Sequence, residues 1–315
     1  MQRRRFLGGL ISAGVYARIA RATSFAGLTP LQMRVKAQLD LNVSDELTVG
    51  AVMMVVRQGK VLALEAAGYM DSTTKIPMPT NAIFDSRSIS KPVTVFAALQ
   101  LVDAGKLGLD DPISRFLPAF AHPTVKGVGH LSEVPITIRQ LMMHTSGIAA
   151  ERPPQLENIT RTFDRTLAED VALVAEQPLD FTPGTQWAYS SSGIAVLGRI
   201  VEVVSAEPFE RFMHENIFVP LDMEDSSFFT NQTKISRVPT MYNLENGHLV
   251  KDVMDVTRPH QKYSAPEFGM FSTAEDLRHF GQMMLDRGTW KRRRLLSEPL
   301  IAEMTTPVWQ TAVPN

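Results

Sequence analysis

Two apolar stretches near the start of the chain are separated by a polar turn. Residues 48–56 and 61–69 are rich in β-branched and small apolar side chains, and the sequence RQGK stands between them at positions 57–60. This arrangement predicts an antiparallel hairpin. Both predicted strands are apolar at nearly every position, which is expected of a sheet that is covered on both faces.

The stretch at positions 92–104, PVTVFAALQLVDA, is apolar on all sides except at Thr94, Gln100 and Asp103. A helix with this pattern is expected in the centre of the molecule, and Gly105 provides its natural stop. Further helices with irregular links are predicted at positions 138–143, 167–176, 193–205 and 209–218.

A helix start signal follows a looser, polar stretch at positions 225–266. The sequence STAE at positions 272–275 matches the capping-box pattern, in which the first residue caps the helix. The helix that it opens is amphipathic, because its apolar residues are spaced by three and four and share one face. These residues are Leu277, Phe280, Met283 and Met284.

Composition limits the classes of protein to consider. The 315 residues are 44% apolar and 21% charged, so the chain can bury a substantial core and is not disordered. The net charge is -1 and no basic stripe is present, so nucleic acid is not an expected partner. No cysteine is present, which excludes disulfides, thiolate nucleophiles and cysteine-based metal sites. No stretch suits a bilayer, so we predict a soluble globular protein without a stable membrane anchor.

The first residues have the order of regions found in an export signal. Arg3, Arg4 and Arg5 precede an apolar stretch at positions 8–17, and a small-x-small exit follows at 20–22. The sequence Arg-Arg-x-Phe-Leu also resembles the twin-arginine signal, which carries folded proteins across the bacterial inner membrane. We therefore expect residues 1–22 to be a signal and residues 23–315 to form a periplasmic domain. A basic, mobile N-terminus or an interrupted amphipathic helix is the alternative.

The familiar cofactor and metal patterns are absent from the sequence. It contains no Gly-x-Gly-x-x-Gly, no phosphate loop, no His-Glu-x-x-His and no Gly-x-Ser-x-Gly elbow. None of the seven histidines forms a metal-ligand pair at helical spacing. No metal and no organic cofactor is therefore expected.

A Ser-x-x-Lys pattern occurs twice, in different surroundings. Ser72 and Lys75 lie in a polar connector rich in proline, which we interpret as a solvated loop. Ser88 and Lys91 lead directly into the apolar helix, and Pro92 is tolerated only in the first turn of a helix. Ser88 is therefore predicted at the helix N-terminus, in the cap or first position, where its hydroxyl can meet the Lys91 amine.

This placement suits nucleophilic catalysis. A serine hydroxyl needs a base to remove its proton, and a lysine becomes a usable base when burial lowers its pKa. The helix N-terminus adds positive potential where an oxyanion forms. The alternative is a capping Ser88 with Lys91 paired elsewhere, and the motif alone leaves both open.

A second candidate group follows a turn, at positions 181–193. Tyr189 lies there in a loop between two predicted helices, with the small polar Ser191 two residues further on. A phenol beside a lysine ammonium loses its proton more readily, which makes Tyr189 a candidate second base. Taken alone, Tyr189 is also consistent with a packing residue whose hydroxyl bonds to the backbone.

Four blocks resemble the serine β-lactamase and penicillin-binding-protein superfamily, especially its class C-like branch. They include FDSRSISKPVTVFAALQLVDAGKLGLDDPISRFLP at 84–118, VPITIRQLMMHTSGI at 134–148, PGTQWAYSSSGIAVLGRIVEVVS at 183–205 and FGMFSTAEDLRHFGQMML at 268–285. The resemblance runs in the same order from about position 47 to 307. It implies an antiparallel sheet flanked by helices, with an inserted all-helical subdomain over roughly 107–266.

The resemblance also assigns roles. It implies that Ser88 is the acylated nucleophile, that Lys91 accepts its proton, and that Tyr189 is the general base shared with Lys91. Ser191 occupies a substrate-binding position where the branch usually has asparagine, and a hydroxyl cannot offer an amide NH2 to a substrate carbonyl. The block His144-Thr145-Ser146-Gly147 also invites a Ser–His interpretation, but the resemblance treats it as structural, with a minor role in shaping the cleft.

The third motif of the superfamily, Lys-Thr-Gly or His-x-Gly on a strand, is not found where it is expected. The match HFG at positions 279–281 lies inside the amphipathic helix and is interpreted as coincidence. We therefore expect the C-terminal strands of the sheet to be missing. Arg292, Arg293 and Arg294 are interpreted as a solvated loop after a helix.

The sequence as a whole predicts a periplasmic serine hydrolase. Its substrate would be a small ester or amide, including β-lactam-like carbonyls, and Ser88 would form an acyl-enzyme. Within the branch an esterase is favoured over a β-lactamase, partly because of Ser191, and a D-alanyl peptidase comes third. The alternative hypothesis is a truncated, non-catalytic or merely acylable penicillin-binding-like protein.

Overall fold

The computed structural model describes residues 27–127, 131–149, 162–229, 231–252, 254, 256–258 and 261–307. It divides into two units. The smaller one extends to Thr80 and includes Leu244–Leu249, and the larger one comprises Asn81–Asn243 and Val250–Asn315. Across the described ranges, no helix has the length and apolar character needed to span a membrane. The predicted export signal at 1–22 lies outside the described residues, and it stays a prediction.

The smaller unit contains the predicted hairpin. Strands β1 (Gly50–Arg57) and β2 (Lys60–Gly68) pair antiparallel. Gln58 and Gly59 both have positive φ, 52° and 74°, at the turn between them. Two successive residues of this kind match the right-handed twist of the strands. The hairpin is therefore confirmed, with boundaries within two residues of the prediction.

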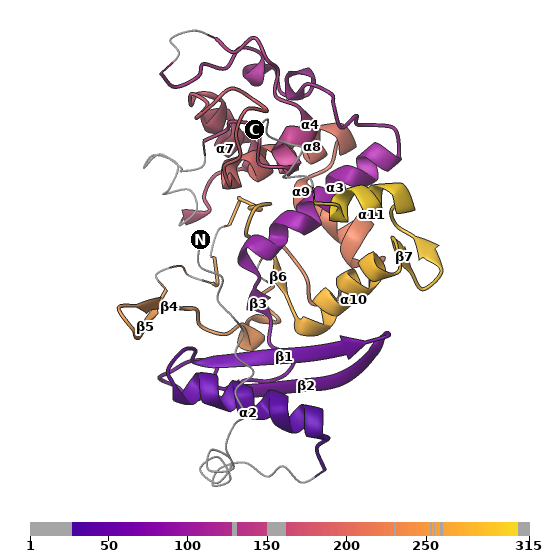
Figure 1. Cartoon of the computed structure of the whole chain (residues 1–315). Helices are drawn as coiled ribbons and strands as arrows, with labels where there is room; N and C mark the ends of the chain where they lie inside the picture. Colours follow the sequence, from indigo (N-terminus) through magenta and orange to yellow (C-terminus); the bar gives the residue numbers. More distant parts are fainter. Residues whose placement is uncertain are drawn as a thin grey trace. The chain divides into compact units, whose positions relative to one another are not determined.

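The hairpin is covered less than its sequence indicates. Helix α2 (Pro30–Ser44) packs against it, as Figure 1 shows, and forms with it a small core. The buried members of this core are Val35, Leu39, Ala63 and Ala67. Val61 and Leu62 are 44% and 40% exposed, and most other strand residues are half-buried. Within this unit the one helix can cover only one face of the two-stranded sheet, and the expected burial of nearly every strand position is not found.

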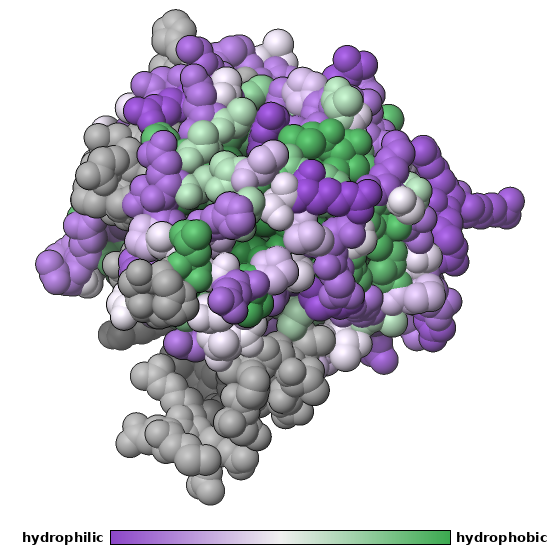
Figure 2. Space-filling view, turned by 90° about the horizontal axis from the view of Figure 1, so that it is seen from above, coloured by the Kyte–Doolittle hydropathy of each residue, from purple (hydrophilic) through white to green (hydrophobic). Residues whose placement is uncertain are grey.

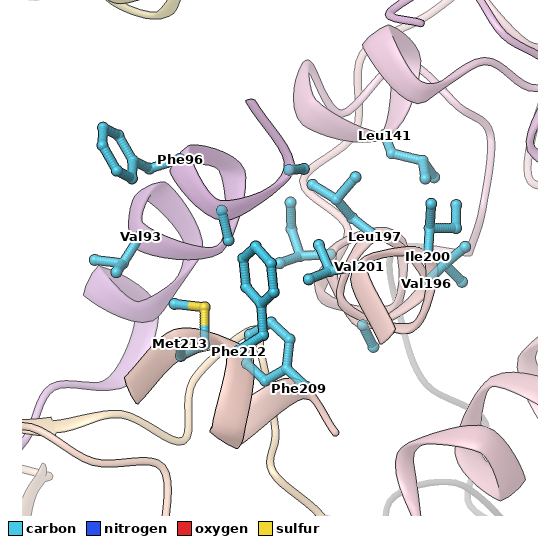
Figure 3. Close-up of a cluster of buried hydrophobic side chains, with 14 of the residues drawn as sticks. Val93, Phe96, Leu141, Val196, Leu197, Ile200, Val201, Phe209, Phe212 and Met213 are labelled. Carbon is cyan, nitrogen blue, oxygen red and sulfur yellow. The ribbon is translucent and has the colours of Figure 1, made fainter. Parts of the chain in front are cut away.

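The larger unit is built around helix α3 (Ser90–Asp103), whose central residues are buried (Figure 1). Helices α8 (Ser191–Ser205), α4 (Ile138–Met142) and α9 (Phe209–Met213) gather near it. The predicted central helix is thereby confirmed. Figure 3 shows buried side chains of these four helices: Leu197 and Val201 of α8 lie on the side that faces α3, whereas Val93 and Phe96 point from α3 away from α8.

Helices α7 (Leu167–Ala175) and α10 (Ala274–Leu285) were also placed well, with small shifts at their ends, whereas α11 (Glu298–Thr305) was not predicted. Helix α9 continues into a π-helical turn at His214–Phe218. The cap of α10 differs from the prediction. Thr273, and not Ser272, is the N-cap, and its side chain accepts a hydrogen bond from the backbone N–H of Asp276. The start signal was therefore placed one residue too early.

Short structures fill the connections. The short helical turns of the 3-10 type are Arg87–Ile89, Ile113–Arg115, Pro118–Phe120 and Ile235–Arg237. The two-stranded antiparallel sheets are β3 (Phe84–Asp85) with β6 (Phe271–Ser272), β4 (Tyr242–Glu245) with β5 (His248–Lys251), and β7 (Thr289–Trp290) with β8 (Arg293–Arg294).

Figure 2 shows hydrophobic residues gathered between hydrophilic ones on one face of the molecule.

These findings confirm the predicted fold class, a mixed α/β fold with antiparallel strands and flanking helices. The strands occur as separate pairs rather than as one large sheet. The polar stretch at 225–266 contains the β4–β5 hairpin, and the run of arginines forms part of a second exposed hairpin instead of a loop. The inserted helical subdomain stays a prediction.

Candidate active site

Ser88 lies in a tight turn between a strand and the central helix. Strand β3 ends at Asp85, the 3-10 turn Arg87–Ile89 contains Ser88, and α3 begins at Ser90. The sequence placed Ser88 at the cap or first position of the helix. In the structure it lies two residues before α3, and Ile89 occupies the cap position. The 3-10 turn that precedes α3 accounts for the difference, because it takes up the residues that were expected to start the helix. Pro92 still lies within the first turn of α3, as expected.

The turn is strained, and side chains hold it. Arg87 has φ 47°, in the left-handed region that non-glycine residues rarely adopt. The Asp85 carboxylate accepts a hydrogen bond of 3.1 Å from the backbone N–H of Arg87. The Arg87 guanidinium forms an ion pair of 2.8 Å with Asp252. Ser88 itself is exposed, so its hydroxyl is accessible from solvent.

The structure brings Ser88, Lys91 and Tyr189 together. Lys91 Nζ donates hydrogen bonds to Ser88 Oγ at 3.0 Å and to the backbone carbonyl of Glu267 at 2.7 Å. The Tyr189 hydroxyl donates to Ser88 Oγ at 2.8 Å. Lys91 is 6% exposed, and its Nζ lies 4.8 Å from the centre of the Tyr189 ring. One hydroxyl therefore receives hydrogen bonds from an ammonium group and from a phenol.

The loop that carries Tyr189 is fixed at several backbone positions. Ser190 is the N-cap of α8, and its side chain accepts from the N–H of Gly193 at 3.0 Å. The N–H of Ala188 donates to the carbonyl of His144 at 3.0 Å, and the N–H of Gly184 donates to the carbonyl of Thr145 at 2.8 Å. The Tyr189 loop and the segment that follows α4 therefore form one local structure.

The charges around Tyr189 favour its ionised form. Partial burial raises the pKa of the Tyr189 phenol, but hydrogen bonding by Lys91 and Ser88 and the charge of Lys91 lower it. The lowering influences prevail, and the pKa of Tyr189 lies below its usual value of 10.0. The side chain is 45% exposed, so a substrate can approach its hydroxyl. This phenol can therefore accept a proton from Ser88 more readily than an isolated tyrosine.

His144 lies beside Tyr189, closer to the chemistry than the sequence indicated. The two ring centres are 4.8 Å apart, and His144 Nδ1 accepts a hydrogen bond of 3.2 Å from the backbone N–H of Ser190. Burial, and after it the charge of Lys91, lower the pKa of His144. The sequence block around His144 was noted, but no spacing rule indicates that its ring would contact a tyrosine 45 positions later.

A buried ion pair beneath the turn was not predicted. Arg258 and Asp85 form a salt bridge whose side chains are fully buried. The guanidinium lies 4.4 Å from the ring centre of Phe163 and 4.5 Å from that of Phe271, and it donates to the carbonyl of Gly269. Asp85 and Arg258 are far apart in the sequence and belong to no local motif, so no sequence signal could have paired them.

The remaining candidates lie apart from these contacts. Ser191 is the first residue of α8 and is half-buried, and within the described chain no hydrogen bond joins its hydroxyl to Ser88, Lys91 or Tyr189. The second Ser-x-x-Lys pattern lies in a turn, where Asp71 accepts from two backbone N–H groups and the exposed Lys75 lies over the Tyr69 ring. That pattern is a surface turn, as predicted.

No metal-binding arrangement is found in the described ranges. They contain no group of three or more histidine or acidic side chains that could hold a metal ion. The HFG match at 279–281 lies within α10, as expected. The hydrogen bonds that join Lys91 and Tyr189 to Ser88 can support proton transfer among these three side chains.

Comparisons with known proteins show to which family the chain belongs. The model of the Beta-lactamase family matches residues 39–314. An uncharacterized protein of Mycobacterium tuberculosis is 36% identical over 278 residues, which cover 82% of this chain and 67% of that protein. The esterase EstB of Burkholderia gladioli is 30% identical over 275 residues, which cover 78% of this chain and 68% of the esterase.

A solved structure supports the same conclusion for the fold. EstCE1, a hydrolase with promiscuous acyltransferase activity, superposes with a TM-score of 0.73 and is 26% identical, over 86% of this chain and 76% of that one. The resemblance seen in the four sequence blocks is thereby confirmed. With nearly the whole described region matched, this chain belongs to the beta-lactamase family.

Proposed function

We propose that this chain is a serine hydrolase that forms an acyl-enzyme at Ser88 with ester or amide substrates. The observation that carries the proposal is the pair of hydrogen bonds that Lys91 and Tyr189 donate to Ser88 Oγ. Membership of a hydrolase family with an esterase relative supports it.

The proposed first step transfers a proton and forms a bond. The Tyr189 phenolate, paired with the Lys91 ammonium, accepts the Ser88 proton while Ser88 Oγ attacks the substrate carbonyl carbon. The tetrahedral oxyanion then collapses, the bond to the leaving alcohol or amine breaks, and Tyr189 returns the proton to that group. The Lys91 ammonium stabilises the phenolate and holds Ser88 Oγ in position.

The proposed second step releases the acid. A water molecule attacks the acyl-enzyme carbonyl, Tyr189 accepts a proton from that water, and the proton returns to Ser88 Oγ as the ester bond breaks. The alcohol or amine leaves before water attacks the acyl-enzyme, which gives ping-pong kinetics.

Among substrates, we propose esters before β-lactams and D-alanyl peptides. Ser191 offers a short hydroxyl where an amide NH2 would be needed to bind the amide carbonyl of a β-lactam side chain. The esterase EstB is among the relatives. A periplasmic location is part of the proposal and rests on the sequence of residues 1–22 alone.

Covalent labelling and turnover test this function together. Purified protein is incubated with a fluorophosphonate and with a labelled penicillin, intact mass is measured, and hydrolysis of a nitrophenyl ester is followed. We expect one adduct and measurable turnover, both lost in Ser88→Ala. Ser72→Ala, in the other Ser-x-x-Lys pattern, is the matched control and should retain both.

The same experiment separates the alternative. An adduct that forms at Ser88 without ester turnover would identify a merely acylable protein. Absence of any adduct with a folded protein would indicate a non-catalytic one. Adducts that persist in Ser88→Ala would show that the proposed nucleophile is wrong.

A further inference from the structure

His144 touches the site through two separate contacts. Its ring lies 4.8 Å from the Tyr189 ring at an interplanar angle of 36°, and its Nδ1 accepts the backbone N–H of Ser190 at 3.2 Å. The Trp187 ring lies 6.2 Å from the His144 ring and is nearly perpendicular to it. His144 thus contacts the residue that donates to Ser88 and also the residue that follows it.

The hydrogen bond fixes the chemical form of the imidazole. A ring nitrogen that accepts a hydrogen bond carries no proton, so Nδ1 is bare and Nε2 carries the hydrogen of the neutral ring. Burial and the charge of Lys91 act in the same direction, since both lower the pKa of His144. The backbone of His144 also has φ 59°, a left-handed conformation in which asparagine, aspartate and histidine are enriched.

The backbone N–H that donates to His144 Nδ1 belongs to Ser190, the residue between Tyr189 and helix α8. Ser190 is the N-cap of α8, where its φ is -120° and ψ is 112°, and the bond from its N–H sets the peptide that joins it to Tyr189. The direction of this peptide determines where the Tyr189 side chain leaves the backbone. A displacement of that peptide would move the Tyr189 hydroxyl away from its 2.8 Å contact with Ser88 Oγ.

We propose that His144 is a positioning residue for the hydrolytic reaction: its neutral Nδ1 holds the Tyr189–Ser190 peptide and so keeps the Tyr189 hydroxyl on Ser88 Oγ. This inference rests on the proposed function, because it assigns His144 a role that acts through Tyr189. His144 makes no contact with the substrate in this scheme and transfers no proton.

Two substitutions separate the hydrogen bond from the ring contact. His144→Asn keeps an acceptor near the position of Nδ1 and tolerates the left-handed backbone, but it removes the ring. His144→Phe keeps a ring beside Tyr189 but removes the acceptor. We expect kcat for a nitrophenyl ester to stay within about threefold in His144→Asn and to fall about tenfold to a hundredfold in His144→Phe, since a displacement of 1 Å can cost about a hundredfold. KM should change little in both.

A double-mutant cycle with Tyr189→Phe distinguishes positioning from general structural support. If His144 acts through the Tyr189 hydroxyl, His144→Phe should lower kcat less than about threefold once that hydroxyl is absent, so the effects are strongly non-additive. Additive effects would overturn the proposal. A large loss in His144→Asn together with an active His144→Phe would overturn it as well, because the ring would then be the required feature.

Failure of the proposed function gives a different result. If the unaltered protein neither forms an adduct nor hydrolyses the ester, the hydrolase proposal fails before His144 is tested. Circular dichroism and the melting temperature establish that each variant is folded. If His144→Phe does not fold, His144→Gln replaces it, because its longer side chain carries the acceptor away from the position of Nδ1, and the same loss of kcat is expected.

Discussion

Lys91 and Tyr189 both donate to the Ser88 hydroxyl, but their surroundings suit them to different roles. Lys91 donates a second hydrogen bond to the carbonyl of Glu267, so two acceptors hold its amine in place. Tyr189 has a lowered pKa and an exposed side chain. On these grounds we propose that the Tyr189 phenolate is the base and that Lys91 stabilises it.

This assignment gives a pH prediction. The pKa of Tyr189 lies below 10.0, so kcat/KM for a nitrophenyl ester should rise with pH along a limb whose midpoint lies below that value. Lys91→Gln removes the hydrogen bond and the charge that lower this pKa, so the limb should move to higher pH and the rate at neutral pH should fall. Ser88→Ala measures the spontaneous hydrolysis to be subtracted. A limb that stays in place in Lys91→Gln would show that another group titrates.

At the scale of the elements, helix α8 and the 263–269 loop meet without space between them. A Cβ at the buried Gly198 would come within 2.6 Å of Pro266 Cβ, closer than real Cβ atoms approach. The same loop supplies the carbonyls of Pro266 and Glu267, which accept from Thr94 and Lys91. A change in the packing of α8 against this loop would therefore move the carbonyl of Glu267 that holds Lys91.

Gly198→Ala should lower both the free energy of unfolding and kcat for ester hydrolysis. Overpacking of this kind costs about 1–3 kcal/mol, and displacement of the loop should lower kcat. The matched control is Gly281→Ala in α10, where a Cβ meets no atom within 4 Å. Alanine is favoured over glycine by about 0.5–1 kcal/mol inside a helix. Urea denaturation and ester hydrolysis measure both effects, and a Gly198→Ala protein as stable as Gly281→Ala would contradict this account.

Runs of apolar residues predicted the helices well. Helices α3, α7 and α8 were found within two residues of their predicted ends, and the spacing by three and four identified the buried face of α10. Helix α2 was not predicted, because its apolar residues are spread around the helix and do not form a stripe. The cap of α10 was misplaced because Ser272 and Thr273 are adjacent and both can cap a helix.

At the scale of the whole molecule, contacts between distant segments hold the turn that presents Ser88. Asp85 precedes that turn and pairs with the buried Arg258, which two aromatic rings enclose. Both side chains are fully buried, so water could not solvate the charge of one partner if the other were removed.

Removal of one partner should therefore be costly. Arg258→Ala or Asp85→Ala should each lower the free energy of unfolding by about 3–5 kcal/mol. The double variant should lose clearly less than the sum, because it leaves no unpaired buried charge. Chemical denaturation measures all four proteins, with the more exposed pair of Arg287 and Glu298 as a control expected to cost about 1 kcal/mol or less. Additive losses would contradict the coupling.

Prediction from sequence reached the three side chains that the structure brings together, but not the residues that support them. Ser88 and Lys91 follow from helical spacing, and Tyr189 was found by its loop and by the resemblance. The Asp85–Arg258 pair, and the ring contact between His144 and Tyr189, depend on how distant segments meet. Local sequence patterns carry no information about contacts between distant segments, because the packing of the complete fold determines those contacts.

The anchors of Lys91 and Thr94 are main-chain oxygens, those of Glu267 and Pro266. A main-chain oxygen is still present after its side chain is replaced, so alanine scanning of these positions would not reveal its contribution. Insertion or deletion of a single residue nearby would shift both acceptors at once. We therefore expect a change in the length of this loop to displace Lys91 more than an exchange of one exposed side chain would.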